Sequence, residues 1–114
     1  MINISDKSNS EKYCWGDGCL GWKLLNREEL CVIEEEVSAG KFERRHYHIE
    51  GRQFFYILSG KAVMEIEGID YEIAAGQGIT VEPGKKHQFK NIYDAQVKFL
   101  VITAPKKNGD RIDL

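Results

Sequence analysis

The sequence predicts an all-β fold, either an antiparallel β-barrel or a jelly roll, and three observations lead to this class. Short runs of apolar and β-branched residues recur along most of the chain, glycines separate many of these runs, and no segment carries an apolar stripe of helical spacing. A length of 114 residues allows one hydrophobic core and no second one. Both architectures hide sheet edges, so they suit a chain made of many short strands.

Nine strands are expected in chain order. Residues 61–67 illustrate the pattern, because Ala62, Met64 and Ile66 share one face while the residues between them face the other way. Glycines at positions 60, 68, 76 and 84 allow the positive φ that tight turns require. The expected strands span residues 21–25, 30–37, 44–48, 53–58, 61–67, 71–74, 78–82, 87–91 and 97–103.

The two ends of the chain differ in composition from the expected barrel at 21–104. Residues 1–20 combine a polar tail, expected to be loosely draped, with an arm rich in Trp, Cys and Gly. We interpret the arm as apolar, anchored by its two tryptophans on the barrel or on a second subunit. Its two cysteines could bind metal, but no second pair accompanies them. Residues 105–114 form a C-terminal tail that is expected to close against the barrel.

Composition and charge exclude several function classes. The net charge is −2 and the basic residues are scattered, which argues against a nucleic-acid surface. No apolar run approaches 18 residues, so no membrane span is expected. Three cysteines cannot all pair within one chain, and no leader precedes them, so a reducing cytoplasm is the expected location.

Three histidines and a glutamine are the candidate metal ligands. His46 and His48 are two residues apart, so on a strand their side chains leave the same face. Gln53 has the opposite parity and rejoins the pair only if the chain turns at residues 49–52, which are short, polar at the centre and contain a glycine. His87 opens a strand after a Pro-Gly turn. The sequence therefore predicts that three imidazoles and one amide gather around one ion.

Two short motifs frame these residues. The first comprises Gly40, His46, His48, Gln53 and Gly60, and the second comprises Gly76, Glu82, Gly84, His87 and Asn91. In order and spacing they resemble the two motifs of the small single-domain cupins, over roughly residues 21–104. Gln53 stands where that family has a glutamate, and Glu82 where it has a proline. The resemblance implies a metal site inside a β-barrel, and cupins of this size are usually homodimers.

The chemistry of the donor set suggests which ion it holds. Three neutral imidazoles and a carboxamide suit a divalent transition metal, and we expect Zn, Fe, Ni or Mn. Because Gln53 carries no charge, we expect weaker metal retention than with a glutamate and ready acceptance of an anionic, chelating substrate. At most four protein ligands leave positions open for substrate, as in catalytic sites. The alternative is that the histidines are ordinary polar groups and that a small molecule binds without metal.

Glu35 and Tyr56 are the candidate catalytic residues outside the ligand set. Glu35 shares parity with Ile33 and Val37, and a buried carboxylate near a metal could have a raised pKa and carry a proton. A solvated strand face is the alternative for this acidic run. Tyr56 could present a phenol to the pocket, although strand tyrosines more often pack. The phenylalanines at 54, 55, 89 and 99 are expected to line the barrel and an interface, leaving an apolar pocket.

Two function classes follow from these residues. The first is a metal-dependent enzyme of isomerase, lyase or dioxygenase type that acts on a small oxygen-rich molecule. The second is a non-catalytic cupin that senses or carries a sugar or a small acid. Fold alone does not decide between them, since one fold hosts many functions.

Overall fold

The structure is a computed structural model that describes residues 2–114, and its secondary structure consists of strands. Within these residues no helix is long and apolar enough to cross a bilayer. Met1, the first residue of the expected tail, lies outside the described part. The strands are β1 (Glu11–Gly16), β2 (Cys19–Asn26), β3 (Cys31–Val37), β4 (His46–His48), β5 (Arg52–Ser59), β6 (Lys61–Ile66), β7 (Ile69–Ala74), β8 (Gly78–Val81), β9 (His87–Lys90), β10 (Val97–Ala104) and β11 (Arg111–Asp113).

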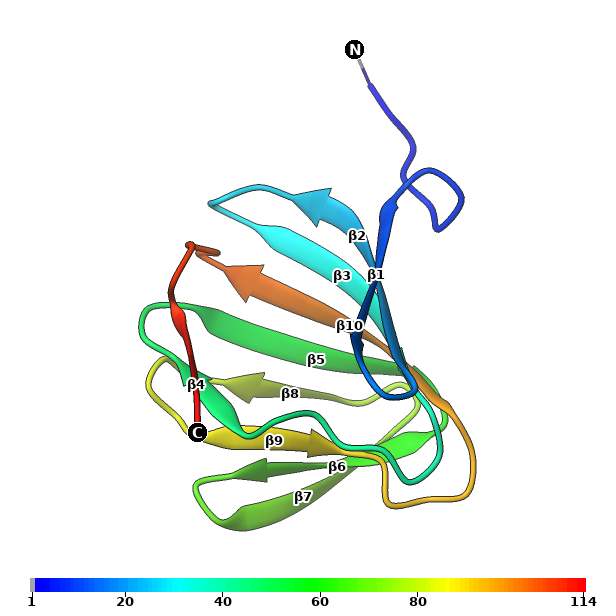
Figure 1. Cartoon of the computed structure of the whole chain (residues 1–114), viewed down its shortest axis with the longest axis vertical. Coiled ribbons are helices and arrows are strands. Elements are labelled where there is room, and N and C mark those ends of the chain that lie inside the picture. The colour runs from blue at the N-terminus through cyan, green and yellow to red at the C-terminus, as the bar shows by residue number, and fades with distance from the viewer. Residues whose placement is uncertain (1) are drawn as a thin grey trace.

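These strands form two antiparallel sheets that face each other (Figure 1). One sheet has the order β1-β2-β3-β10-β5-β8 and the other the order β11-β4-β9-β6-β7. The all-β class is therefore confirmed, and each of the nine expected strands is present with ends shifted by a few residues. Of the two architectures expected, the structure has the jelly roll, since the two sheets remain separate ladders and are not closed into one barrel. The arrangement is that of a jelly roll, in which two sheets enclose the core.

Both ends of the chain add a strand that the sequence pattern did not predict. In the N-terminal segment, β1 pairs with β2, and its Trp15 packs against the core. In the C-terminal segment, β11 pairs with β4, so that Arg111 lies opposite His48 and Asp113 opposite His46 (Figure 1). The three-residue β11 is too short to show a period of its own, which explains why it reads as a tail in the sequence.

Alternating strand residues build the core between the sheets. On β5, Gln53, Phe55 and Ile57 are buried, as their shared parity predicted. Phe99 of β10 is fully buried and stacks on Phe89 of β9 with ring centroids 4.1 Å apart. This stack joins the two sheets, because β10 and β9 belong to different ones. Phe54 instead lies on the outer face of β5 and is 38% exposed, so it does not line the interior.

Candidate metal centre

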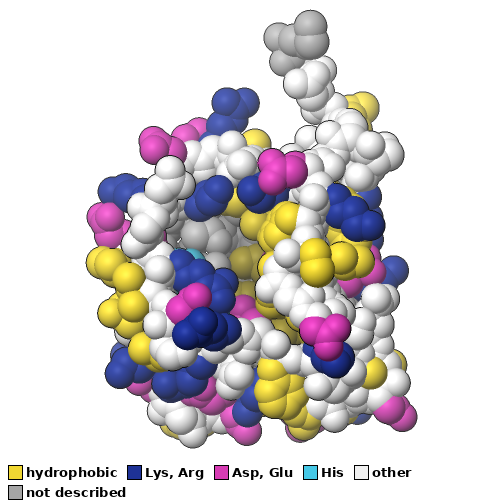
Figure 2. Space-filling view, in the orientation of Figure 1, with side chains coloured by type: hydrophobic (Ala, Val, Ile, Leu, Met, Phe, Trp, Pro, Cys, Tyr) yellow, Lys and Arg dark blue, Asp and Glu magenta, His cyan; other side chains and the backbone are white. Residues whose placement is uncertain are grey.

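A cavity of about 670 Å³ opens between the two sheets. Its volume falls in the range of sites that hold small organic ligands. Figure 2 shows the hollow, with a histidine visible inside and basic side chains around its mouth. Its walls come from β1, β2, β3, β5 and β10 on one side and from β4 and β11 on the other. Residues that share the cavity include Tyr13, Glu35, His46, His48, Gln53 and Arg111.

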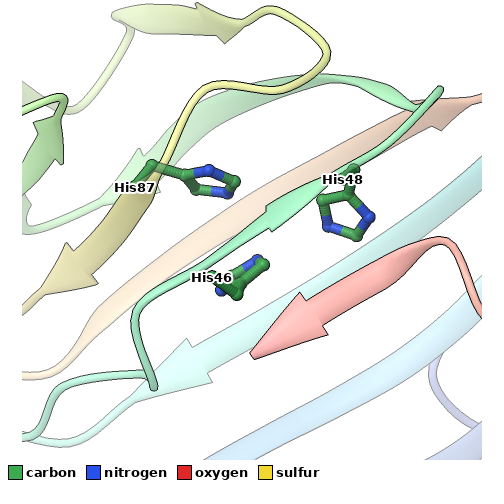
Figure 3. Close-up of side chains that lie close together, drawn as sticks. All are labelled: His46, His48 and His87. Atoms are coloured by element: carbon green, nitrogen blue, oxygen red, sulfur yellow. The ribbon is translucent and has the colours of Figure 1, made fainter. Parts of the chain in front are cut away.

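The three histidines converge as the sequence predicted. His46 and His48 come from β4, and His87 comes from the neighbouring β9, where it lies directly opposite His46 (Figure 3). One ring nitrogen of each histidine lies within 4.8 Å of those of the other two. Ligands of a single ion sit about 2.0–2.1 Å from it and therefore roughly 3–3.5 Å from one another, so the histidine nitrogens would move about 1–2 Å closer together to share one ion. Because β4 and β9 are neighbours, the histidines of the first and second sequence motifs form a single site.

Hydrogen bonds orient the rings. Nδ1 of His46 lies 2.8 Å from the carbonyl oxygen of Arg44, and Nδ1 of His87 lies 2.9 Å from that of Lys85. A carbonyl oxygen only accepts, so each Nδ1 carries the hydrogen and each Nε2 keeps its lone pair. Nε2 of His48 is buried and has no hydrogen-bond partner within residues 2–114. Unpaired nitrogen lone pairs in a buried cluster are what a metal ion needs.

Burial also keeps the rings neutral. Desolvation lowers the pKa of His46 to about 3 and that of His87 to about 4. It also lowers the pKa of His48, against the opposing effect of Asp110. Neutral imidazole is the form that binds metal, so the site is ready to bind at neutral pH without first releasing protons.

Gln53 lies beside the histidines, as expected from the turn that precedes it. Its Oε1 is 3.2 Å from Nε2 of His87, and its Nε2 donates to Oγ1 of Thr103 at 3.1 Å. In this arrangement the two facing atoms of Gln53 and His87 are both acceptors. An ion about 2.1 Å from each atom would see them at an angle of roughly 100°, which lies between octahedral and tetrahedral values. The donor atoms present therefore fit a divalent transition metal.

A half-buried carboxyl group, that of Glu35, and a buried one, that of Glu43, lie in the same cavity. Glu35 faces inward, as its parity predicted, and its Oε2 accepts a hydrogen bond of 3.0 Å from the hydroxyl of Tyr13. Burial raises the pKa of Glu35 to about 7, against the lowering effect of Tyr13. Glu43 accepts a hydrogen bond from the backbone N–H of Phe89 at 2.8 Å, and burial raises its pKa to about 8. The cavity thus holds groups that exchange protons near neutral pH.

Tyr56 is not part of this site. It lies on the outer face of β5, is 36% exposed, and its ring stacks on that of Phe54 at 6.4 Å. Gln53 and Phe55 point inward, so Tyr56 has the opposite parity and must point outward. This corrects the expectation that it presents a phenol to the pocket, and the period of the strand was a sufficient signal to exclude it.

Several residues of the cavity were missed in the sequence. Glu43 lies outside any strand, and Tyr13 lies in a segment read as an arm, although its alternation with Trp15 was a usable signal. The indole Nε1 of Trp15 is buried in the wall, without a partner in the described chain. Basic side chains come from the sequence-distant positions Lys23, Lys106, Lys107 and Arg111.

Comparisons with known proteins agree with this architecture. The family model for the cupin domain matches residues 33–103. The polyketide synthase CurC of Streptomyces cyaneus is 25% identical over 80 residues, which cover 68% of this chain and 52% of CurC. The chain therefore spans about half the length of that relative.

Solved structures resemble the fold over the whole chain. The polyketide cyclase RemF of Streptomyces resistomycificus has a TM-score of 0.83 at 18% identity, covering 100% of this chain and 86% of RemF. The Streptomyces nucleoside dehydratase Pac13 also has a TM-score of 0.83 at 18% identity, covering 100% of this chain and 92% of Pac13. At these identities the likeness concerns the fold alone.

Proposed function

Because the chain belongs to the cupin family, we propose that it is a metal-dependent enzyme acting on a small, oxygen-rich anion. The proposed ligands of a divalent transition metal (Zn, Fe, Ni or Mn) are His46, His48, Gln53 and His87. One observation carries the proposal: three neutral imidazoles converge beside an acceptor oxygen, and two of them, His46 and His48, line a cavity that also holds two proton-carrying carboxyl groups. A purely structural metal site would have no need of such a cavity or of these acids.

The reaction class that this arrangement favours is proton transfer, as in isomerases and lyases. The bound metal supplies Lewis-acid polarisation of a substrate oxygen. Glu35, with a pKa of about 7, is suited to take a proton from the substrate and return it. The hydroxyl of Tyr13 holds that carboxylate in place at 3.0 Å. Two similar proteins are named as a polyketide cyclase and a nucleoside dehydratase, and both names support a small-molecule enzyme.

The proposed substrate is anionic because of the charges that face the cavity. Gln53 leaves the metal charge uncompensated within the ligand set. Lys106, Lys107 and Arg111 line the cavity. Lys106 pairs with the neutral amide of Asn26, whereas Lys107 and Arg111 pair with the carboxylates of Glu50 and Asp113, so Lys106 is the basic group whose charge is free to meet a substrate. The buried N–H of Trp15 is a further donor for a substrate oxygen. These groups are complementary to a molecule that carries carboxylate or enolate oxygens.

Element analysis of the purified protein tests the metal site, with His48→Ala as the diagnostic variant. We expect wild-type protein to carry one transition-metal ion per chain and the variant to lose it while unfolding cooperatively. Tyr47→Phe, on the same strand with the opposite parity, is the matched control and should keep the metal. Stoichiometric metal in His48→Ala would remove that residue from the ligand set. Metal-free wild type that still binds a small acid would favour the non-catalytic binding protein.

We also propose that the protein is a homodimer. Phe54, Tyr56 and Leu58 form an apolar row on the outer face of β5 and are 36–43% exposed. Sedimentation of the wild type should give twice the chain mass, and Leu58→Glu should shift it toward the monomer. A monomeric wild type at micromolar concentration would contradict the proposal. A cytoplasmic location stays a prediction from composition.

A further inference from the structure

Resting on the proposed metal site, we propose that Asp110 is a positioning residue that holds His48 and the following turn in metal-binding geometry. Asp110 belongs to the C-terminal segment, directly before β11, and lies far in sequence from the residues that it contacts. It is only 7% exposed. A buried carboxylate is stable only where its oxygens are satisfied by donors or by positive charge, and all of its described partners lie in or beside the candidate metal centre.

Asp110 accepts hydrogen bonds from every backbone N–H of the turn between β4 and β5. Its Oδ1 accepts from the N–H of Glu50 at 2.8 Å, and its Oδ2 accepts from that of Gly51 at 3.0 Å. Its carbonyl oxygen accepts from the N–H of Ile49 at 3.0 Å. One residue therefore fixes three consecutive peptide groups of the turn that joins His48 to the strand carrying Gln53.

The same carboxylate faces the ring of His48. Oδ2 lies 3.6 Å from Nδ1 of His48, a charge contact slightly longer than a hydrogen bond. His46 and His87 direct Nδ1 to a backbone carbonyl two residues upstream, whereas His48 directs it to this distant carboxylate. The contact favours the tautomer with hydrogen on Nδ1 and leaves the buried Nε2 free for a metal. Carboxylate partners of this kind orient metal-binding imidazoles and raise their basicity.

Gly51 allows the carboxylate to come this close. A Cβ at position 51 would lie 3.0 Å from Oδ2 of Asp110 and 3.1 Å from the carbonyl oxygen of Pro105. Such distances are tighter than ordinary contacts, so a side chain would push the C-terminal segment away from the turn. The glycine thus serves the packing of Asp110 against the backbone between two proposed ligands.

The experiment is zinc binding to the full chain, measured by competition with a chromophoric chelator for wild type, Asp110→Asn and Glu50→Gln. We expect Asp110→Asn to weaken zinc binding roughly 10–100-fold. Glu50→Gln removes a neighbouring charge but keeps the backbone N–H that Asp110 uses, so it should bind zinc within about twofold of wild type. A folded Asp110→Asn protein that also binds zinc within about twofold of wild type would overturn the inference.

A second measurement separates this inference from the proposed function and does not depend on a folded variant. The ¹⁵N shifts of the His48 ring in metal-free wild type should report hydrogen on Nδ1. Hydrogen on Nε2 would overturn the positioning role. If wild-type protein binds no zinc, the proposed function fails, and the ring tautomer still decides whether Asp110 orients His48.

Discussion

Replacing Glu35 with glutamine should remove the part of a pH-dependent loss of stability that comes from this carboxyl group. The pKa of Glu35 rises from its ordinary value of 4.5 to about 7 in the folded protein, mainly through burial. A carboxyl group with a raised pKa contributes stability that is fully present below pH 4.5 and is lost as the pH rises through 7. At about 1.4 kcal/mol for each pH unit, a rise of about 2.5 units makes the loss at most about 3.5 kcal/mol. Because Glu35 is only half-buried, solvent screens its charge and reduces this figure.

The assay is urea unfolding of wild type and Glu35→Gln at several pH values from 5 to 8, at equal metal content. The two proteins should differ little at pH 5, and the variant should be more stable by up to about 3 kcal/mol at pH 8. Glu43 also titrates, with a pKa of about 8 that the charge of Glu35 helps to raise. The test therefore uses the difference in unfolding free energy between the two proteins at each pH. The pH dependence of either protein alone also contains the titration of Glu43.

Glu34→Gln is the matched control for this experiment. Glu34 is the neighbour on the same strand with the opposite parity, and it pairs with Lys7 at 2.6 Å outside the cavity. Its substitution should change stability by only a small amount, because an ion pair near the surface contributes little. If the unfolding free energies of Glu35→Gln and wild type change in parallel from pH 5 to 8, the carboxyl group of Glu35 does not titrate with a raised pKa. That result would refute the reasoning.

Three further predictions concern single side chains. Tyr13→Phe removes a hydrogen bond that lowers the pKa of Glu35, so the pH window of stability loss should move upward in the same unfolding assay. Gln53→Glu adds a negative ligand and should raise zinc affinity on the order of tenfold or more, measured by chelator competition. Phe99→Ala deletes a fully buried ring and should cost about 3–5 kcal/mol of unfolding free energy, whereas Phe54→Ala on the outer face should cost clearly less.

Each of these expectations has a contrary result. An unchanged or lower pH window in Tyr13→Phe would show that its hydroxyl does not stabilise the charged form of Glu35. Unchanged or reduced zinc affinity in Gln53→Glu would argue against Gln53 as a ligand; Gln77→Glu, in an exposed turn, controls for added charge alone. Equal losses for the two phenylalanine variants would contradict the assignment of inner and outer faces on β5 and β10.

Period-two alternation made the inner half of the site predictable from the sequence. His46 and His48 share a face, Gln53 shares its face with Phe55, and Glu35 points inward; in each case the structure agrees. The physical reason is that a strand places alternate side chains on opposite faces wherever it lies in the fold. The same rule places Tyr56 on the outer face. The expectation that Tyr56 reaches the pocket was therefore wrong, and its odd-even position relative to Gln53 already indicated this in the sequence.

The pairing of strands was decided only by the tertiary structure. The residues around His87 do not predict that β9 lies beside β4. The sequence indicates this pairing only through the order of two motifs that resemble those of a known family. Asp110 reaches the turn at 49–51 only because β11 pairs with β4, and Glu43 enters the cavity from a segment without a regular period. Local sequence determines which way a side chain points from its own strand. The distant groups that a side chain contacts depend on how all the strands pair and pack. That pairing is set by hydrogen bonding and burial over the whole chain, and a local sequence pattern does not predict it.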